Sequence, residues 1–323
     1  MKKILVTGAI GQIGSDLVSA LKEKYGQENV VASDIRQPDN VGDFLPFEIL
    51  DVLNVDQIEE IVKKHQIDTI FHLAALLSAT GEKNPQACWK VNMDGLFNIL
   101  EIGRKFNLKK IICPSSIAAF GPTTPRDNTP QATILEPATM YGVTKVAGEL
   151  LCEYYVSKYG LDVRGIRYPG LISYKALPGG GTTDFAVDIF YKAIEHKKYQ
   201  CFVGPDTTLP MMYMDDAIEG TIRLAQADFD SLKHHCNFNF AGMSFSAADL
   251  AKEIKKHIAD FEITYDPDFR QAIADTWPRS IDDTAAREEW GWKPKYDLSK
   301  MVEVMLTKVA EKLGRQDLKI KIG

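Results

Sequence analysis

A glycine-rich turn near the N-terminus constrains the fold of this chain more than any other feature. An apolar run over residues 2–7 is followed by Gly8, Gly11 and Gly14, and a helical pattern begins directly after them. Glycines permit a tight turn and let backbone N–H groups approach a pyrophosphate at the positive end of a helix. Strand, glycine turn and helix in this order predict a βαβ unit that binds a nucleotide.

An acidic residue follows the turn at the distance expected of a dinucleotide site. The apolar residues 30–33 end in Asp34, twenty residues after Gly14. A carboxylate there accepts hydrogen bonds from an adenosine ribose and repels a 2′-phosphate, which favours NAD over NADP. Arg36 leaves NADP open, because an arginine near this position accommodates that phosphate. We predict NAD as the cofactor.

Strands and helices alternate along the first half of the chain. Apolar runs at 47–49, 69–75, 110–116 and 162–167 alternate with helical patterns at 55–65, 85–106 and 140–159. This alternation predicts an α/β fold with a parallel sheet, whose ligands bind at the carboxyl ends of the strands. Besides the glycine turn, that edge would carry Asp34, Asp51, Ala74, Ala75, Ser115 and Ser116.

The pattern becomes less regular after residue 174. A Pro-Gly-Gly-Gly run at 178–181 interrupts the chain, and the later expected elements are helices at 182–196, 215–227, 246–259 and 298–313 and strands at 200–203 and 236–240. We therefore predict a nucleotide-binding domain over residues 1–174, to which some later segments return. Residues 175–323 would form mainly a smaller, discontinuous lobe that covers the substrate.

A tyrosine and a lysine four residues apart are candidates for proton transfer. On a helix this spacing brings the Lys145 ammonium near the Tyr141 hydroxyl. A cation there favours the phenolate, which can exchange a proton with a carbinol or carbonyl oxygen. An ordinary amphipathic helix is the alternative, and the same spacing recurs at residues 154/158 and 296/300. Position separates them, since Tyr141 begins a helix 25 residues after Ser116, and either Ser115 or Ser116 could hold the substrate oxygen.

Composition excludes several classes of function. Apolar residues make up 45% and charged residues 25%, as in ordinary globular proteins. The net charge is −6 without a dense basic block, which argues against nucleic acid, and no apolar run is long enough to span a membrane. The first strand starts too close to Met1 for a signal peptide, so we expect a cytoplasmic location. The five dispersed cysteines have no CxxC pair, and we predict reduced thiols and no metal site.

The ordered set of motifs resembles the extended short-chain dehydrogenase/reductase superfamily across nearly the whole chain. The resemblance implies a Rossmann fold with a doubly wound parallel sheet, bound NAD, a Ser/Tyr/Lys catalytic group and a homodimer formed through the helices at 85–106 and 140–159. The catalytic residues would be Ser115, Ser116, Tyr141 and Lys145. The residues implied at the cofactor are Gly8, Gly11, Gln12, Ile13, Gly14, Asp34, Ile35, Arg36, Asp51, Val52, Leu73, Ala74, Ala75, Asn92, Tyr141, Lys145 and Tyr168.

Four segments, at 77–82, 179–186, 209–217 and 273–278, are similar to the short-chain family of L-threonine 3-dehydrogenases. This closer resemblance implies oxidation of the C3 hydroxyl of L-threonine to 2-amino-3-oxobutanoate with reduction of NAD, Tyr141 being the general base. The residues implied at the substrate are Ser78, Ser115, Ser116, Tyr141, Gly180, Thr183 and Trp277.

Two other functions remain open from the sequence. One is a nucleotide-sugar epimerase or dehydratase, although Phe120 stands where many such relatives have tyrosine. The other is a protein that binds NAD without catalysis, which would have no use for the Ser/Tyr/Lys group. Thr183 could also serve as a helix cap and Trp277 as a packed loop aromatic.

Overall fold

Six short parallel strands form the central sheet of the structure, a computed structural model that describes residues 1–175 and 181–315. The strand order is β3-β2-β1-β4-β5-β7, which confirms the predicted α/β fold with a doubly wound Rossmann sheet. The strands are β1 (Ile4–Thr7), β2 (Val30–Asp34), β3 (Phe47–Ile49), β4 (Thr69–His72), β5 (Lys110–Ile112) and β7 (Val163–Arg164).

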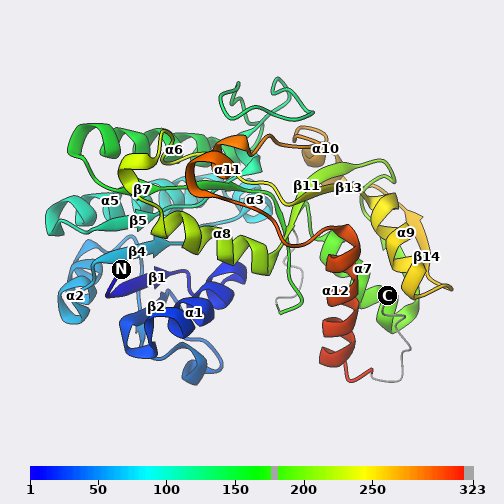
Figure 1. The fold of residues 1–323 in the computed structure, drawn as a ribbon, viewed down its shortest axis with the longest axis horizontal. Coiled ribbons are helices and arrows are strands. Elements are labelled where there is room, and N and C mark those ends of the chain that lie inside the picture. Colours follow the sequence, from blue (N-terminus) through cyan, green and yellow to red (C-terminus); the bar gives the residue numbers. More distant parts are fainter. Residues whose placement is uncertain (176–180, 316–323) are drawn as a thin grey trace.

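Helices cover both faces of this sheet (Figure 1). The side chains of β1 alternate between two cores: Leu5 packs with one group of helices, and Ile4 and Val6 pack with the other. Burial on both faces explains why these strands are continuous apolar runs. The first group consists of α2 (Val55–His65), α5 (Gly95–Phe106) and α6 (Met140–Tyr159), and the second of α1 (Gln12–Tyr25) and α8 (Met214–Gln226).

Two predicted strands divide in the structure. The run at 110–116 becomes β5 and β6 (Ser115–Ser116), because Pro114 between them has no N–H to continue the ladder. The run at 162–167 becomes β7 and β8 (Ile166–Tyr168), with Gly165 at the junction. A Cβ on Gly165 would lie 2.5 Å from the carbonyl oxygen of Cys236. β6 and β8 pair in parallel and form a second sheet with β12 (Phe238–Asn239).

The predicted helix at 85–106 is also interrupted. It consists of α4 (Pro85–Trp89), a π-helical turn (Lys90–Asp94) and α5. The helix expected from residue 182 begins three residues later as α7 (Phe185–His196). The sequence did not predict the short helices α3 (Ser78–Lys83), α10 (Phe269–Ala274) and α11 (Thr284–Trp290).

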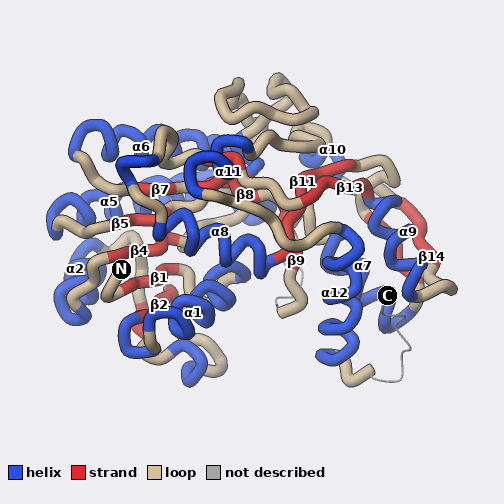
Figure 2. The backbone as a smooth tube through the Cα atoms, viewed as in Figure 1, coloured by secondary structure: helices blue, strands red, loops and turns tan. Residues whose placement is uncertain are grey.

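The later segments build a second lobe with its own core. Helices α7, α9 (Ala247–His257) and α12 (Leu298–Lys312) pack together beside two small sheets (Figure 2). One sheet pairs β10 (Lys198–Cys201) with β14 (Glu262–Tyr265), and the other places β11 (Thr208–Tyr213) between β9 (Gly170–Ile172) and β13 (Met243–Ser246). The sequence missed β11, which contains Pro210, because proline argues against an interior strand.

Later segments, α8 among them, return to the first lobe. Ile218 and Ile222 of α8 are buried in the same core as Leu17 and Leu21 of α1. The exact boundary predicted at residue 174 remains a prediction. In the described part of the chain, no helix has the length and apolar character to cross a membrane.

Candidate active site

The glycine turn closes tightly against the neighbouring strand end. Gly8 has a φ of +68°, and a Cβ there would lie 2.7 Å from the backbone nitrogen of Ala74. A Cβ on Gly14 would lie 2.2 Å from the carbonyl oxygen of Gly8. Both approaches are shorter than real Cβ contacts allow, so the turn requires glycine at both positions.

The N-terminus of α1 is suited to a pyrophosphate. Gly11 is its N-cap, no side chain caps the helix, and its first turn contains no acidic residue. The carboxylate of Asp34 lies beside the turn, where it accepts the N–H of Ile10 at 3.3 Å and of Ile35 at 2.9 Å. These residues fit NAD, whose pyrophosphate would lie at the helix N-terminus and whose ribose would lie at Asp34.

One cavity brings together most of the predicted site. The predicted residues that line it are Gly8, Gly11, Gln12, Ile13, Gly14, Leu73, Ala74, Ala75, Ser78, Asn92, Ser115, Ser116, Tyr141, Lys145, Tyr168, Thr183 and Trp277. The turn at β1, the catalytic candidates on β6 and α6, and the segments at 78, 183 and 277 therefore share one space.

Five predicted cofactor residues lie outside the lining of this cavity. They are Asp34, Ile35, Arg36, Asp51 and Val52, which lie at or after the ends of β2 and β3, one and two strands away from β1. Ile35 is 66% exposed, whereas Val52 is buried beneath α5, where its Cγ2 would meet a Cβ on Gly95 at 2.9 Å. Gly180 lies outside the described residues.

Tyr141 and Lys145 lie at the start of α6, which Thr139 caps by accepting the N–H of Gly142 at 3.1 Å. Tyr141 is buried and Lys145 Nζ lies 5.3 Å from the centroid of its ring. The same Nζ donates a hydrogen bond of 2.8 Å to the carbonyl oxygen of Pro114, which directly precedes the two serines. The ammonium is therefore held between the tyrosine and the end of β5.

The two other Tyr-Lys pairs lie away from the cavity. Tyr154 is 49% exposed on the outer face of α6. Lys300 Nζ lies 4.6 Å from the centroid of the Tyr296 ring, closer than in the pair at the cavity, but the Tyr296 hydroxyl donates to Asp215 at 3.3 Å. The lysine therefore contacts the tyrosine ring both in the pair at the cavity and in the pair at 296/300. These two pairs differ in where they lie in the fold.

The two adjacent serines have different hydrogen bonds. Ser115 Oγ donates its proton to Glu149 Oε1 at 2.6 Å in a buried environment. Ser116 Oγ accepts the N–H of Ala118 at 3.2 Å, which caps the 3-10 turn over Ile117–Ala119 and leaves the Ser116 proton available. Ser116 is therefore the better donor to a substrate oxygen.

Two predicted cofactor residues use their polar groups within the protein. Asn92, in the π-helical turn, accepts the N–H of Leu76 at 2.8 Å and donates to Leu76 O at 3.0 Å and Thr144 Oγ1 at 3.1 Å. It thereby joins the segment after β4 to α6. The hydroxyl of Tyr168 hydrogen-bonds to Thr221 on α8, and burial raises the pKa of this tyrosine.

The cavity has further polar lining residues that the sequence analysis did not assign to it. His72 Nδ1 lies 2.9 Å from Thr7 Oγ1, and burial lowers the pKa of this histidine to about 3, assisted by the Lys145 ammonium, so it is neutral. Asp184 accepts the N–H of Gly181 at 2.7 Å. Glu149 follows Lys145 by four residues on one helix face, a spacing that could have identified it from the sequence.

Comparison with known proteins identifies the family. Residues 4–239 match the model of the NAD dependent epimerase/dehydratase family. The chain belongs to this family. An uncharacterized epimerase/dehydratase from Staphylococcus haemolyticus is 50% identical over 315 residues, which are 97% of this chain and 99% of the relative. Membership confirms NAD as the cofactor and the resemblance to extended short-chain dehydrogenases/reductases.

Solved structures of the family are equally similar. The L-threonine dehydrogenase of Clostridium difficile is 52% identical with a TM-score of 0.95, and the match covers 97% of this chain and 98% of that one. The holo form of an L-threonine dehydrogenase from Cupriavidus necator is 50% identical with a TM-score of 0.93, over 95% and 99% of the two chains. These neighbours support an NAD-dependent oxidoreductase that acts on a small molecule.

Proposed function

We propose that the protein is an L-threonine 3-dehydrogenase, which oxidises the C3 hydroxyl of L-threonine to 2-amino-3-oxobutanoate and reduces NAD. The observation that carries the proposal is the single cavity in which the nucleotide turn meets the Tyr141/Lys145 pair together with Ser78, Thr183 and Trp277. Solved L-threonine dehydrogenases that match nearly the whole chain at about half identity support the choice of substrate.

The side chains at the cavity suit the removal of a proton from a secondary alcohol. NAD, when bound, supplies the acceptor for the hydride that leaves C3. Tyr141 would take the hydroxyl proton, with the ammonium of Lys145, held by Pro114 O at 2.8 Å, beside its ring. Ser116 would donate its free proton to the same substrate oxygen and hold it in place while the carbonyl forms.

The charged groups of the cavity fit a small amino acid better than a nucleotide sugar. Asp184 provides a carboxylate for an ammonium group, and Thr183 provides a hydroxyl beside it. Among the described residues that line the cavity, Lys145 is the one Lys or Arg side chain. A nucleotide diphosphate would require further cations or a second helix terminus for its phosphates.

The test is formation of NADH, followed by absorbance, when purified protein is mixed with NAD and L-threonine. We expect turnover with wild type and a loss of about 10³-fold or more in kcat for Tyr141→Phe, because the base is removed while the ring remains. Tyr154→Phe, which alters the exposed pair on the same helix, serves as the matched control and should retain activity. Folded wild type that forms no NADH from L-threonine would refute the proposal.

A nucleotide-sugar epimerase or dehydratase is the second candidate, since the family description includes both activities. Such an enzyme returns the hydride to its product and releases no net NADH. Incubation with UDP- and dTDP-sugars, analysed by chromatography of the products, separates this activity from threonine oxidation. Conversion of a nucleotide sugar without NADH release would replace the threonine proposal, and NAD binding without either reaction would indicate a sensing role.

A further inference from the structure

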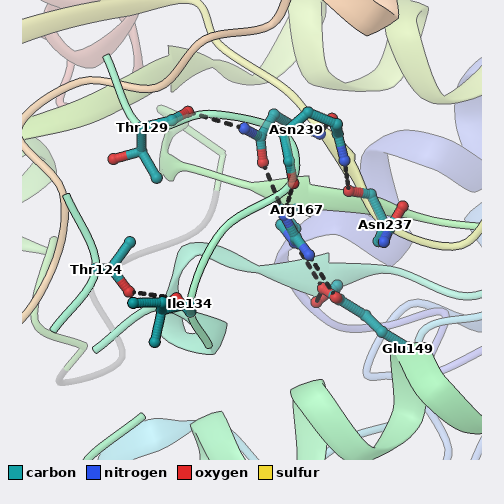
Figure 3. A network of polar contacts seen from close by, with 9 residues as sticks. Thr124, Thr129, Ile134, Glu149, Arg167, Asn237 and Asn239 are labelled. Carbon is teal, nitrogen blue, oxygen red and sulfur yellow. Dashed lines mark hydrogen bonds and ion pairs between the residues drawn. The ribbon is translucent and has the colours of Figure 1, made fainter. Parts of the chain in front are cut away.

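A buried ion pair lies beside Ser115. Glu149 of α6 and Arg167 of β8 form two hydrogen bonds, Arg167 Nε to Glu149 Oε1 at 2.9 Å and Nη2 to Oε2 at 2.7 Å (Figure 3). The side chains are 4% and 2% exposed. Glu149 Oε1 also accepts the proton of Ser115 at 2.6 Å. The carboxylate therefore connects α6, β8 and β6 at one point.

The polar network continues from Arg167 to Asn239 and from there to the segments of Thr129 and Asp282. Arg167 Nη1 donates to the side-chain oxygen of Asn239 at 3.1 Å, and Asn239 Nδ2 donates to the carbonyl oxygen of Thr129 at 3.1 Å (Figure 3). Asn239 Nδ2 also donates to the carbonyl oxygen of Asp282 at 3.0 Å. Asn239 thus holds two chain segments that pair with each other at Thr129 and Ile281.

The second of these segments carries Trp277 to the cavity. Arg126 Nε donates to the carbonyl oxygen of Trp277 at 3.3 Å, and the N–H of Arg279 donates to Arg126 O at 2.7 Å. A series of hydrogen bonds therefore leads from Ser115 through Glu149, Arg167 and Asn239 to the segment that carries Trp277, and these bonds are buried or half-buried as far as Asp282.

Such a pair is a poor means of stabilising a fold. Removing a carboxylate and a guanidinium from water costs nearly as much as their attraction returns, so a buried pair contributes little net stability compared with apolar side chains. What a buried, multiply bonded pair does provide is one defined geometry, because few other arrangements satisfy all its donors and acceptors.

We propose that Glu149 and Arg167 are positioning residues of the active site, an inference that rests on the proposed threonine oxidation. Glu149 engages the Ser115 proton and so fixes the register of β6, which sets the place of the neighbouring Ser116 hydroxyl. Arg167 binds Asn239, which holds the segment that carries Trp277, and so sets the position of that segment relative to β6. Proton transfer at Tyr141 and enclosure of the substrate then depend on one buried junction.

The experiment compares this pair with a second ion pair, that of Arg164 in β7 with Asp162, whose side chain is 17% exposed. Arg164 is as buried as Arg167, binds Asp162 at 2.6 Å and donates to backbone carbonyls, but neither partner lines the cavity. Glu149→Gln and Asp162→Asn each remove the charge of one carboxylate and keep its shape. Both variants should unfold at lower urea concentration than wild type, so loss of stability alone does not distinguish them.

The two variants should differ in their kinetics with L-threonine. We expect Glu149→Gln to lower kcat by roughly 10- to 100-fold, since displacements of about 1 Å at a reacting group have effects of this size. Asp162→Asn should keep kcat within about 2-fold. A double-mutant cycle then asks whether Glu149 acts through Ser115: Glu149→Gln added to Ser115→Ala should lower kcat no further than either change alone.

Several results would overturn the inference. They are a kcat near that of wild type in folded Glu149→Gln, an equal loss in Asp162→Asn, or independent multiplication of the losses in the cycle. If Glu149→Gln does not fold, Ser115→Ala alone decides, because it leaves the ion pair whole, and an unchanged kcat in that variant refutes the positioning role.

A readout without substrate separates this inference from the proposed function. Amide hydrogen exchange of residues 115–118, measured by mass spectrometry on NAD-bound protein, should become faster in Ser115→Ala and Glu149→Gln and remain as in wild type in Asp162→Asn. Faster exchange without threonine oxidation by wild type would refute the proposed substrate alone. Unchanged exchange in both variants would refute the positioning role whichever substrate the enzyme takes.

Discussion

The neutral histidine beside the nucleotide turn makes the stability of the protein depend on pH. His72 ends β4 and lies 2.9 Å from Thr7 Oγ1, and burial lowers its pKa from the ordinary 6.5 to about 3. In the folded protein the ring therefore stays neutral at pH 5, whereas in the unfolded chain it is mostly protonated. Replacement by asparagine keeps a polar partner for Thr7 and removes the titrating group.

The sign and size of the effect follow from proton linkage. Because the unfolded chain binds the additional proton, folding loses free energy as the pH falls below 6.5, and this loss continues until about pH 3. Each pH unit is equivalent to about 1.4 kcal/mol, so His72 lowers the free energy of unfolding by about 2 kcal/mol between pH 7 and pH 5.

Urea denaturation of the NAD-free protein at pH 7 and pH 5 measures the effect. The decrease in unfolding free energy between the two pH values should be about 2 kcal/mol smaller in His72→Asn than in wild type. His196→Asn, at a side chain that is 62% exposed at the end of α7, should behave as wild type. Equal decreases in wild type and His72→Asn would show that the ring titrates alike in both states and would refute the reasoning.

Three further changes have defined outcomes. Gly8→Ala should weaken NAD binding, measured by titration calorimetry, by 10-fold or more, because the new Cβ would lie 2.7 Å from the backbone after β4. Gly160→Ala is the control, since Gly160 has a similar φ of +64° and no neighbour within 4 Å. It should lower the free energy of unfolding by about 1 kcal/mol and leave NAD binding unchanged. Leu150→Glu changes a side chain that is 68% exposed on α6, and it should convert the predicted homodimer to monomers in sedimentation analysis. If the variant and wild type sediment alike, the predicted interface is refuted. Asp216→Ala removes the carboxylate that accepts the N–H groups of Lys295 and Tyr296 at 3.0 Å. The free energy of unfolding, measured by urea denaturation, should fall by about 3 kcal/mol. An unchanged midpoint would show that water replaces the carboxylate as the acceptor.

The first lobe could be predicted closely because its signals are local. The helices at 55–65 and 140–159 have the bounds expected from apolar periodicity and capping residues. The second lobe was less predictable. β11 contains a proline, pairs with strands from two different parts of the chain and is buried through those contacts, none of which appears in its own sequence.

The active site shows the same division between local and distant information. Gly8, Tyr141 and Lys145 could be proposed for the site because the glycine spacing and the position of the Tyr-Lys pair after Ser116 can be read in the sequence. Asn92 and Tyr168 were expected at the cofactor, but their polar groups bind Leu76 and Thr221, partners that come from other elements. A motif therefore predicts where a residue lies better than it predicts what its side chain binds.

The sequence alone does not distinguish the roles of the two serines. Ser115 and Ser116 are identical side chains in adjacent positions, and strand geometry points them to opposite faces without saying which face has an acceptor. The difference comes from Glu149, on the helix that carries Tyr141, and from Arg167, on a strand that follows it. Glu149 engages the proton of Ser115, whereas Ser116 Oγ only accepts the N–H of Ala118, so the difference between the two serines depends on a buried charge that comes from another element.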